Sequence, residues 1–399
     1  MARSSASSSE RPARAGFPAA GARVYLDYAG FSPVDPRVVA VMRPFFEGGV
    51  GNPNAQHSLG LEARSTLDGA RAKVARLFAA TPGGVIFTAN ATEANNLAVK
   101  GLAPRTGARH IVTSAIEHVS LIDSCRELEK RGWSVTYVGV DAEGRVDPEA
   151  VARAIRDDTA LVSVMAANNE IGTIQPVREI GRVARARGVP FHVDAVGAAG
   201  RVPLLVDDCR VDLLTISSND LYGPPGAGAL WARASVELAP LTVGGGQERG
   251  YRAGTENLPA IAGMGVAADL ARVELAGEVA RLGALRDRLL SGLLARIPDA
   301  RQTGARGVDR LPQHASIVVP GVKADSALTD LDLRGVAASS GAAMTGEPSH
   351  VLRAIGCDRD AAEGSLCFTL GRWTTATEID LVLDAVPAVV TRLRRQASP

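Results

Sequence analysis

The sequence predicts an α/β protein in which a mostly parallel, mixed sheet lies between layers of helices. From residue 24 onward, short runs rich in β-branched residues alternate with longer helical patterns. The clearest strand-like runs are residues 84–88, 110–113, 161–165 and 190–194, and the helical patterns between them cover residues 61–79, 120–131 and 177–187. Such alternation is typical of parallel sheets covered on both faces, and ligands of these sheets bind at the carboxyl ends of the strands.

A smaller α+β region is predicted beyond a long helical stretch at residues 261–293. Its two strand-like runs are residues 315–319 and 365–370, and an amphipathic helix at residues 378–395 follows them. The expected division is a disordered tail over residues 1–21, a large domain over residues 22–262 whose first segment packs on the small domain, and a small C-terminal domain over residues 263–399.

Composition excludes several classes of partner. The chain has 399 residues, of which 46% are hydrophobic and 22% charged, so it can bury a large core. Its net charge of +1 gives no overall field that would attract nucleic acid or an anionic membrane. No apolar run approaches the roughly 20 residues that span a bilayer, and the Ser-rich start of the chain lacks the apolar core of a secretory signal. We expect a cytoplasmic protein with no nucleic-acid or membrane partner.

The use of cysteine and lysine bears on cofactors. The cysteines are Cys125, Cys209, Cys357 and Cys367. Their spacing matches neither a CxxC pair nor a metal site, so we expect reduced thiols and no bound metal. The chain has only four lysines, which are Lys73, Lys100, Lys130 and Lys323. None of these lysines belongs to the motifs described next.

The stretch at residues 217–224 reads Ser-Ser-Asn-Asp-Leu-Tyr-Gly-Pro and resembles Ser-Gly-His-Lys-Ile-Tyr-Gly-Pro in cysteine desulfurases of the class V aminotransferase family. The resemblance extends from residue 25 to the C-terminal helix. It implies the aminotransferase fold type I, pyridoxal phosphate (PLP) as cofactor, and a homodimer with its active site between the protomers. The other similar blocks, in family order, are Gly-Asn-Pro at 51–53, Ala-Thr-Glu-Ala-Asn-Asn at 91–96, Glu-His at 117–118, Asn-Asn-Glu-Ile-Gly at 168–172, His-Val-Asp-Ala at 192–195, Gly-Gly-Gly-Gln-Glu-Arg-Gly at 244–250 and Arg-Ala-Gly-Thr-Glu-Asn at 252–257.

The cofactor pocket of that family has counterparts here. The resemblance implies that the phosphate is bound by Thr92, Ser217 and, from the partner protomer, Thr255; that His118 stacks on the pyridine ring; that Asp194 faces the ring nitrogen; and that Asn169 lies near the ring hydroxyl. Independently of the family, Thr92 opens a predicted helix, where free N–H groups and the helix dipole favour an anion. Structural alternatives remain: Thr92 as a plain helix cap, and Asp194 as a plain strand end.

Five positions depart from the family's pattern. Asp220 stands in place of the Schiff-base lysine, and Asn219 in place of the histidine before it. Gly197 replaces a glutamine, Met344 replaces the persulfide-forming cysteine, and Cys367 replaces the arginine that binds the substrate carboxylate. A carboxylate has no amine that can form an imine, and a thioether has no proton to lose.

These replacements lead us to expect no covalently bound cofactor. The PLP aldimine is predicted to be absent, and noncovalent binding of a PLP-like ligand is left open. The pocket should be about three elementary charges more negative than a desulfurase site, so either Asp194 or Asp220 should be protonated near neutral pH, or a cationic or hydrogen-bonding ligand should pair with them. Tyr28 and Phe31 replace small polar residues and are expected to reshape one wall.

Two functions follow from this combination of kept and lost residues. The favoured one is a repurposed, PLP-independent enzyme that acts on an unidentified small molecule in the old PLP pocket, with Asp220 and His118 as acid/base candidates. The alternative is a non-catalytic pseudoenzyme that serves as a scaffold or binds a protein partner, for example in sulfur transfer. An ordered cavity would favour the enzyme, and a collapsed one the scaffold. A third hypothesis is an active desulfurase with unusual residues. Cys367 is a distant nucleophile candidate, and a core thiol is the preferred interpretation.

Overall fold

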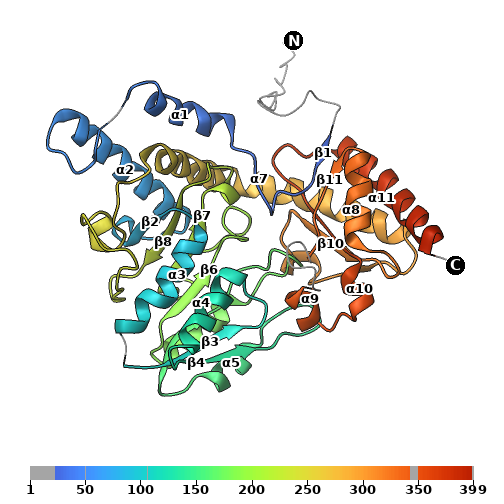
Figure 1. Ribbon diagram of the computed structural model, residues 1–399, viewed down its shortest axis with the longest axis horizontal. Helices are drawn as coiled ribbons and strands as arrows, with labels where there is room; N and C mark the ends of the chain where they lie inside the picture. Colours follow the sequence, from blue (N-terminus) through green and yellow to red (C-terminus); the bar gives the residue numbers. More distant parts are fainter. Residues whose placement is uncertain (1–22, 50, 106, 342–348, 398–399) are drawn as a thin grey trace, which may run out of the picture.

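The computed structural model describes residues 23–49, 51–105, 107–341 and 349–397 as two lobes joined by one long helix (Figure 1). The α/β prediction is confirmed, and each strand-like run named above forms a strand whose bounds differ by two residues or fewer. The tail expected over residues 1–21 and the residue Met344 lie outside the described residues.

A seven-stranded sheet forms the centre of the large lobe. Its strand order is β2-β8-β7-β6-β5-β3-β4, and all neighbours are parallel except β8, which runs antiparallel to β2 and β7. The parallel strand β5 is buried along its whole length because helices cover both faces of the sheet. The strands are β2 (Val85–Thr88), β3 (His110–Ser114), β4 (Ser134–Val138), β5 (Thr159–Ser163), β6 (Phe191–Asp194), β7 (Leu213–Ser217) and β8 (Gly228–Ala232).

Two layers of helices cover this sheet. Val85 and Phe87 of β2 belong to the core formed with α2, α6 and the start of α7, whereas Ile86 between them belongs to the core formed with α3 and α4. This alternation is the two-residue period of a strand. The helices of the large lobe are α1 (Pro36–Phe46), α2 (Ser58–Leu77), α3 (Ala91–Leu102), α4 (Val119–Glu129), α5 (Pro148–Ala154) and α6 (Val177–Ala186).

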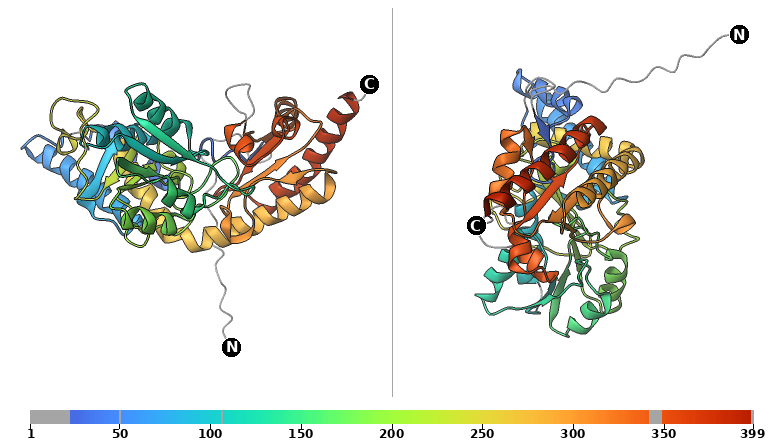
Figure 2. Two further views of the ribbon diagram at one scale, coloured as in Figure 1. Left: turned by 90° about the horizontal axis from the view of Figure 1, so that it is seen from below. Right: turned by 90° about the vertical axis from the view of Figure 1, so that its right-hand side faces the viewer.

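Helix α7 (Leu258–Arg296) runs along both lobes (Figure 2). Its residues up to Ala271 contribute to the core of the large lobe, and those from Leu282 onward contribute to the core of the small lobe. The small lobe holds an antiparallel sheet of order β12-β10-β9 and a parallel pair of β1 with β11, so the first strand of the chain lies in this lobe. Its elements are β1 (Val24–Tyr25), β9 (Arg301–Gln302), β10 (His314–Val318), α8 (Ala324–Leu333), β11 (Val336–Ala337), α9 (His350–Ala354), α10 (Arg359–Glu363), β12 (Ser365–Thr369) and α11 (Ala376–Ala397).

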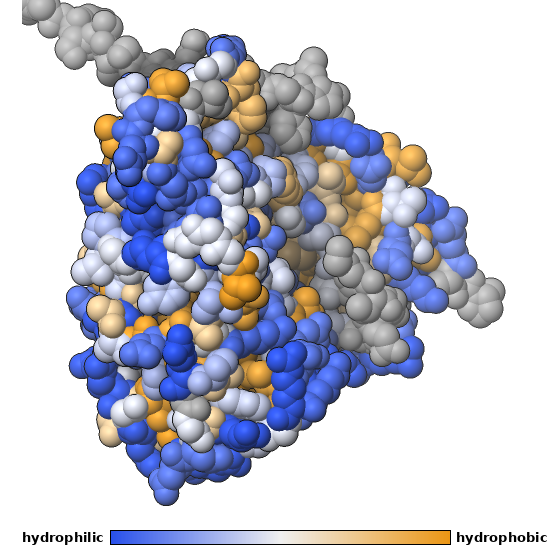
Figure 3. Space-filling model, turned by 60° about the vertical axis from the view of Figure 1, so that its left-hand side comes forward, coloured by the Kyte–Doolittle hydropathy of each residue, from blue (hydrophilic) through white to orange (hydrophobic). Residues whose placement is uncertain are grey.

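The surface is hollowed where the two lobes meet (Figure 3). A cavity at this junction is lined by residues that follow the strands of the large sheet and by residues of the segment leading into β10. Within the described ranges, no helix is both long enough and apolar enough to cross a membrane.

Candidate functional site

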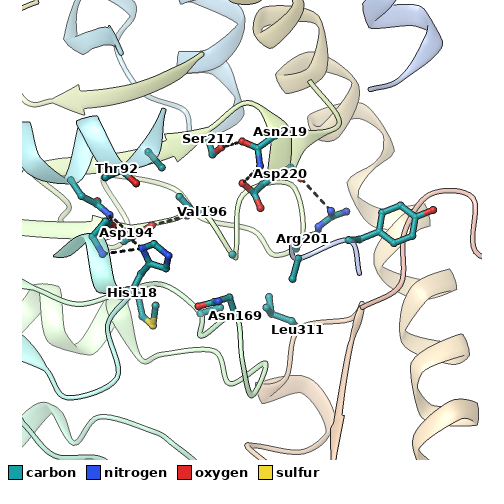
Figure 4. Close-up of a pocket in the computed structure, with 18 of the residues that line it drawn as sticks. Thr92, His118, Asn169, Asp194, Val196, Arg201, Ser217, Asn219, Asp220 and Leu311 are labelled. Atoms are coloured by element: carbon teal, nitrogen blue, oxygen red, sulfur yellow. Dashed lines mark hydrogen bonds between the residues drawn. The ribbon is translucent and has the colours of Figure 1, made fainter. Parts of the chain in front are cut away.

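The cavity has a volume of about 250 Å³ and lies at the carboxyl ends of the parallel strands. Asp194 ends β6 and Ser217 ends β7, and His118 follows β3 as the N-cap of α4. All three line the cavity, together with Thr92 and Asn169 (Figure 4). The structure thus brings together five of the six predicted cofactor-binding residues, and the topology of the sheet is the reason.

Asp194 is held rigidly in the floor of this cavity. Its side chain is 4% exposed, and its two oxygens accept hydrogen bonds from Asn95 Nδ2 at 2.7 Å and from the Val196 backbone N–H at 3.0 Å. Burial raises the pKa of Asp194 above its usual range, although these hydrogen bonds and the nearby His118 oppose the rise. Asp194 is therefore more than a plain strand end.

A short network fixes the ring of His118. Asn95 Nδ2 also donates to Ser120 Oγ at 2.9 Å, and Ser120 Oγ lies 2.8 Å from His118 Nδ1. The Ser120 backbone N–H donates to the same Nδ1 at 3.2 Å, so Nδ1 is the acceptor and Nε2 carries the proton of the neutral ring. Asp194 and His118 are thus oriented by one set of side chains (Figure 4).

Thr92 does not cap its helix. The N-cap of α3 is Asn90, whose Oδ1 accepts from the Glu93 N–H at 2.9 Å. Thr92 is the second residue of α3 and is exposed at the cavity, so its hydroxyl is open to a ligand beside the helix N-terminus. The helix-cap alternative for Thr92 is wrong.

Asp220 lies in the cavity wall, within a single turn of 3-10 helix (Asn219–Leu221) after β7. Ser217 Oγ donates to Asn219 Oδ1 at 2.5 Å, and Asn219 Nδ2 donates to Asp220 Oδ2 at 3.1 Å. Tyr222, at φ 62°, ends the turn in the left-handed region. Asn219 therefore links Ser217 to the carboxylate of Asp220.

Burial raises the pKa of Asp220 to about 6, and the charge of Asp194 adds to the rise, whereas Ser217 and Arg201 oppose it. The pKa values of both cavity carboxyls therefore lie above their usual range. The direction agrees with the expectation that the two acids do not both ionise freely in one pocket.

The remaining residues singled out in the sequence divide into two that line the cavity and three that do not. Tyr28 and Gly197 line the cavity, but Phe31 is 44% exposed and does not. Thr255 is exposed and lies outside this cavity, as a residue reaching a partner's pocket would, and that role stays a prediction. Cys367 is 4% exposed in β12 and also does not line the cavity.

The thiol of Cys367 is buried on the face of β12 opposite to Leu366 and Phe368, which belong to the core of the small lobe. Its Sγ lies 3.4 Å from His314 Nε2, and burial raises its pKa to about 12. A thiol with that pKa carries almost no thiolate at neutral pH, so it is a poor nucleophile. Cys367 is therefore a buried, weakly reactive thiol beside polar groups, and its role stays a prediction.

Several cavity residues were missed by reading the sequence. The polar or bulky ones far from the predicted motifs are Arg201, Leu311, Gln313 and His314. The last three lie in and just before β10, and the whole of α7 separates them from β8, the last strand of the large sheet, so no local pattern marks them. Arg201 follows the end of β6 by one irregular turn, so a cation shortly after a strand end was the available signal.

Comparisons with known proteins agree with this fold. A family model described as aminotransferase class V matches residues 24–382. Cysteine desulfurase IscS 1 of Archaeoglobus fulgidus is 43% identical over 375 residues, which are 93% of this chain and 97% of that protein. Cysteine desulfurase IscS of Dictyoglomus turgidum is 43% identical over 376 residues, or 93% and 95% of the two chains. A solved structure of a NifS-like protein superposes with a TM-score of 0.87 at 35% identity, covering 93% of this chain and 100% of that one. The fold is therefore the aminotransferase fold type I.

The comparisons overturn one expectation, the absence of a covalently bound cofactor. Relatives at 43% identity along nearly the whole chain are cysteine desulfurases, the proteins whose reaction uses PLP held as an aldimine. The expected absence of that aldimine is therefore wrong. Residue 220 itself is a carboxylate, so this side chain does not supply the nitrogen of such a link.

The residues present fit PLP in its noncovalent contacts. Thr92 and Ser217 supply hydroxyls near a helix N-terminus, the anchored Asp194 supplies a carboxylate for the pyridine nitrogen, and His118 supplies a ring with a fixed orientation. Asn169 lies beside Leu311, across the cavity from Ser217 and Asp220 (Figure 4). Bound PLP supplies an electron sink for a carbanion on the substrate.

Proposed function

This chain belongs to the class V aminotransferase family as a cysteine desulfurase-like protein, and we propose that its pocket binds a phosphorylated pyridoxal-type ligand and catalyses a reaction on a small molecule other than free cysteine. Thr92 and Ser217 would bind the phosphate, Asp194 would face the ring nitrogen, His118 would stack on the ring and Asn169 would lie near its hydroxyl. Asp220 and His118 are the residues that would move protons.

The ionisation of Asp220 at the cavity carries this proposal. Its pKa is raised to about 6 by burial, so near neutral pH the group exists in both its acidic and its basic form. A general acid or base is most effective when its pKa lies near the working pH. Asn219 holds one carboxylate oxygen and leaves the other for a substrate proton.

Two positions argue against free cysteine as the substrate. The residue at the family's carboxylate-binding position is Cys367, which is neutral, buried and outside the cavity lining. Met344 stands where the family has the cysteine that accepts the sulfur, and a thioether offers no thiolate. These two positions therefore supply neither the family's carboxylate contact nor its sulfur acceptor.

The persistence of the cavity favours an enzyme over a scaffold. Replacing Lys, Arg and Gln at family positions has not let neighbouring side chains fill the space, and about 250 Å³ remains between the two lobes. A protein that only offered an outer surface would not need this volume or the network that orients His118.

A homodimer is part of the proposal. Large apolar side chains are exposed on α1, α2 and the loop that precedes Thr255, and these are Phe46, Leu59, Leu61 and Val243. Such a surface is typical of an interface. In a dimer, Thr255 of one copy would reach the phosphate end of the other copy's cavity, and light scattering of the purified protein tests for the dimer.

Sulfide release tests the proposed substrate. Purified protein supplied with PLP and L-cysteine should release sulfide at least about 100-fold more slowly than the Dictyoglomus turgidum desulfurase, because it lacks the family's proton-transferring amine. Asp220→Lys alone should not raise the rate, since Met344 offers no thiolate. A rate that equals the relative's, or turnover recovered by that single change, would refute the proposal.

Ligand binding tests the pocket separately. PLP should bind tighter than pyridoxal, which lacks the phosphate, and Thr92→Val should reduce this difference. Lys130→Met, on the exposed end of α4, is the matched control. If PLP and pyridoxal bind equally, the phosphate site is absent and the proposed ligand class is wrong.

A further inference from the structure

Arg201 is a buried cation at the cavity whose charge is not balanced by an ion pair. Its side chain is 8% exposed and lines the cavity, opposite His118 in the close-up (Figure 4). Nη1 donates to Tyr222 Oη at 3.0 Å and Nη2 to the Asp220 backbone carbonyl at 3.2 Å, and both acceptors are neutral. Among the described residues, no acidic side chain forms an ion pair with this guanidinium.

The side chain of Arg201 is also held in place. Its guanidinium carbon lies 4.8 Å from the centroid of the Tyr222 ring. The same ring contacts Arg372 at 4.4 Å, but Arg372 is neutralised by Asp35 and by Glu274, the latter at 2.8 Å. The ring of Tyr222 therefore contacts two arginines. Of these, only Arg372, which does not line the cavity, forms ion pairs with carboxylates of the protein.

A third buried arginine shows that the lack of an acid does not by itself create a site. Arg310 is 2% exposed, and its donors contact four oxygen acceptors, which are the carbonyls of His314, Thr303 and Ala305 and the hydroxyl of Ser316. Arg310 does not line the cavity, whereas Arg201 lines it and uses two of its five N–H donors in the contacts above.

We propose that Arg201 binds an anionic group of the ligand, a carboxylate, at the end of the cavity away from His118. This deepens the proposed function and rests on it, because it names the chemistry of the second half of the ligand: a phosphate at Thr92 and Ser217, and a carboxylate at Arg201. The side chain thereby takes over, from the large lobe, the recognition that Cys367 in the small lobe cannot provide.

Desolvation of the guanidinium of Arg201 favours the binding of an anion. A buried guanidinium has lost its hydration, and neutral acceptors return only part of that energy. A carboxylate that enters the cavity restores the lost interaction through short, charge-assisted hydrogen bonds in a medium of low polarity. The carboxyl of Asp220 is close enough for the charge of Arg201 to lower its pKa, but it accepts a side-chain hydrogen bond from Asn219 and forms no ion pair with Arg201.

Two stable ligands that differ only in a carboxylate test the proposal. Reduced phosphopyridoxyl-L-alanine carries the phosphate and a carboxylate, and reduced phosphopyridoxyl-ethylamine carries the phosphate alone. Calorimetric titration of the full chain should show the alanine adduct binding on the order of tenfold tighter. Arg201→Met should abolish that ratio and leave the ethylamine adduct bound as before, and Arg201→Lys should keep part of it.

The outcomes separate this inference from the function on which it rests. Arg182→Met, on the exposed face of α6, is the control and should not alter the ratio. If Arg201→Met weakens both adducts equally, Arg201 only supports the turn at Asp220 and the inference is overturned. A ratio near one in the unaltered protein also overturns it. If neither adduct binds, the proposed ligand class fails first.

Discussion

Arg71 and Arg201 are buried to nearly the same degree, at 7% and 8% exposure, and both stack on an aromatic ring. They differ in whether a carboxylate of the protein balances their charge. Arg71 on α2 meets the carboxylate of Glu248 through two hydrogen bonds of 2.7 and 2.8 Å, and Glu248 also accepts the Phe87 N–H. Arg201 meets only neutral acceptors.

The difference shows which charge is structural and which serves a ligand. Where the chain supplies the counter-charge, as at Arg71, it ties α2 to the loop before α7 and closes the core of the large lobe. Where it leaves the counter-charge out beside a cavity, a ligand can supply it. Two buried cations of equal exposure therefore have opposite consequences for stability and for binding.

The largest expected effect is a difference in the free energy of unfolding between variants of the two arginines. Arg71→Met leaves Glu248 buried without a counter-charge and should lower the free energy of unfolding by about 3–5 kcal/mol. Arg201→Met leaves only neutral acceptors unpaired and should cost about 1–2 kcal/mol. Urea unfolding of both ligand-free variants measures the two losses. Equal losses would mean that Arg201 is a structural arginine like Arg71.

The next effect concerns pH and asks whether Asp220 neutralises Arg201. Burial alone would raise the pKa of Asp35, but the hydrogen bonds and charges of Arg37 and Arg372 lower it, as expected for a true counter-ion. The pKa of Asp220 is raised instead, to about 6. Unfolding therefore releases a proton from Asp220 between about pH 4 and 6, and the stability due to this group falls as the pH rises through that window.

Asp220→Asn removes this ionisation and should show it directly. Above pH 6 the variant should be more stable than the unaltered protein by up to about 2 kcal/mol, after allowance for water in the cavity, and below pH 4 the difference should vanish. Unfolding free energies measured at pH 4, 6 and 8 give the comparison. A variant that is less stable at pH 8 would indicate that Asp220 is a genuine partner of Arg201.

The smallest effect is expected at Cys367, which the sequence motifs predict to replace a carboxylate-binding arginine. Cys367→Ala should change the affinity for either phosphopyridoxyl adduct less than about twofold, because the thiol does not line the cavity. With its pKa raised to about 12, the thiol should also resist iodoacetamide at pH 8, while the partly exposed Cys357 reacts. Peptide mass spectrometry reads both sites, and fast labelling of Cys367 would reopen its role as a nucleophile.

Much of the fold could be predicted from local patterns. The strands at residues 110–113 and 190–194 and the helix at residues 177–187 appear with nearly the expected bounds, because a period of two or of 3.6 residues in apolar positions is a local property. The pairing of β1 with β11 was not predicted, since it joins segments more than three hundred residues apart and depends on how the small lobe packs.

The candidate site divides in the same way. Thr92, Asp194 and Ser217 were predicted because they stand in motifs that resemble those of cysteine desulfurases. The fold brings them together because strand ends meet at one edge of a parallel sheet. Phe31 was expected at the wall beside Tyr28, but the chain turns after Tyr28 and leaves that ring exposed. Arg201 was not predicted as a site residue because its role depends on which groups surround its guanidinium in the folded chain.

The sequence by itself determined the architecture, the family and the carboxylate at position 220, because periodicity, motif order and residue identity are all local. Only the tertiary structure decided which charges are balanced. Arg71 finds its acid 177 residues away, and Arg201 finds none among the described residues. Electrostatic pairing acts through space over a few ångströms, so it depends on the folded arrangement and not on the order of residues.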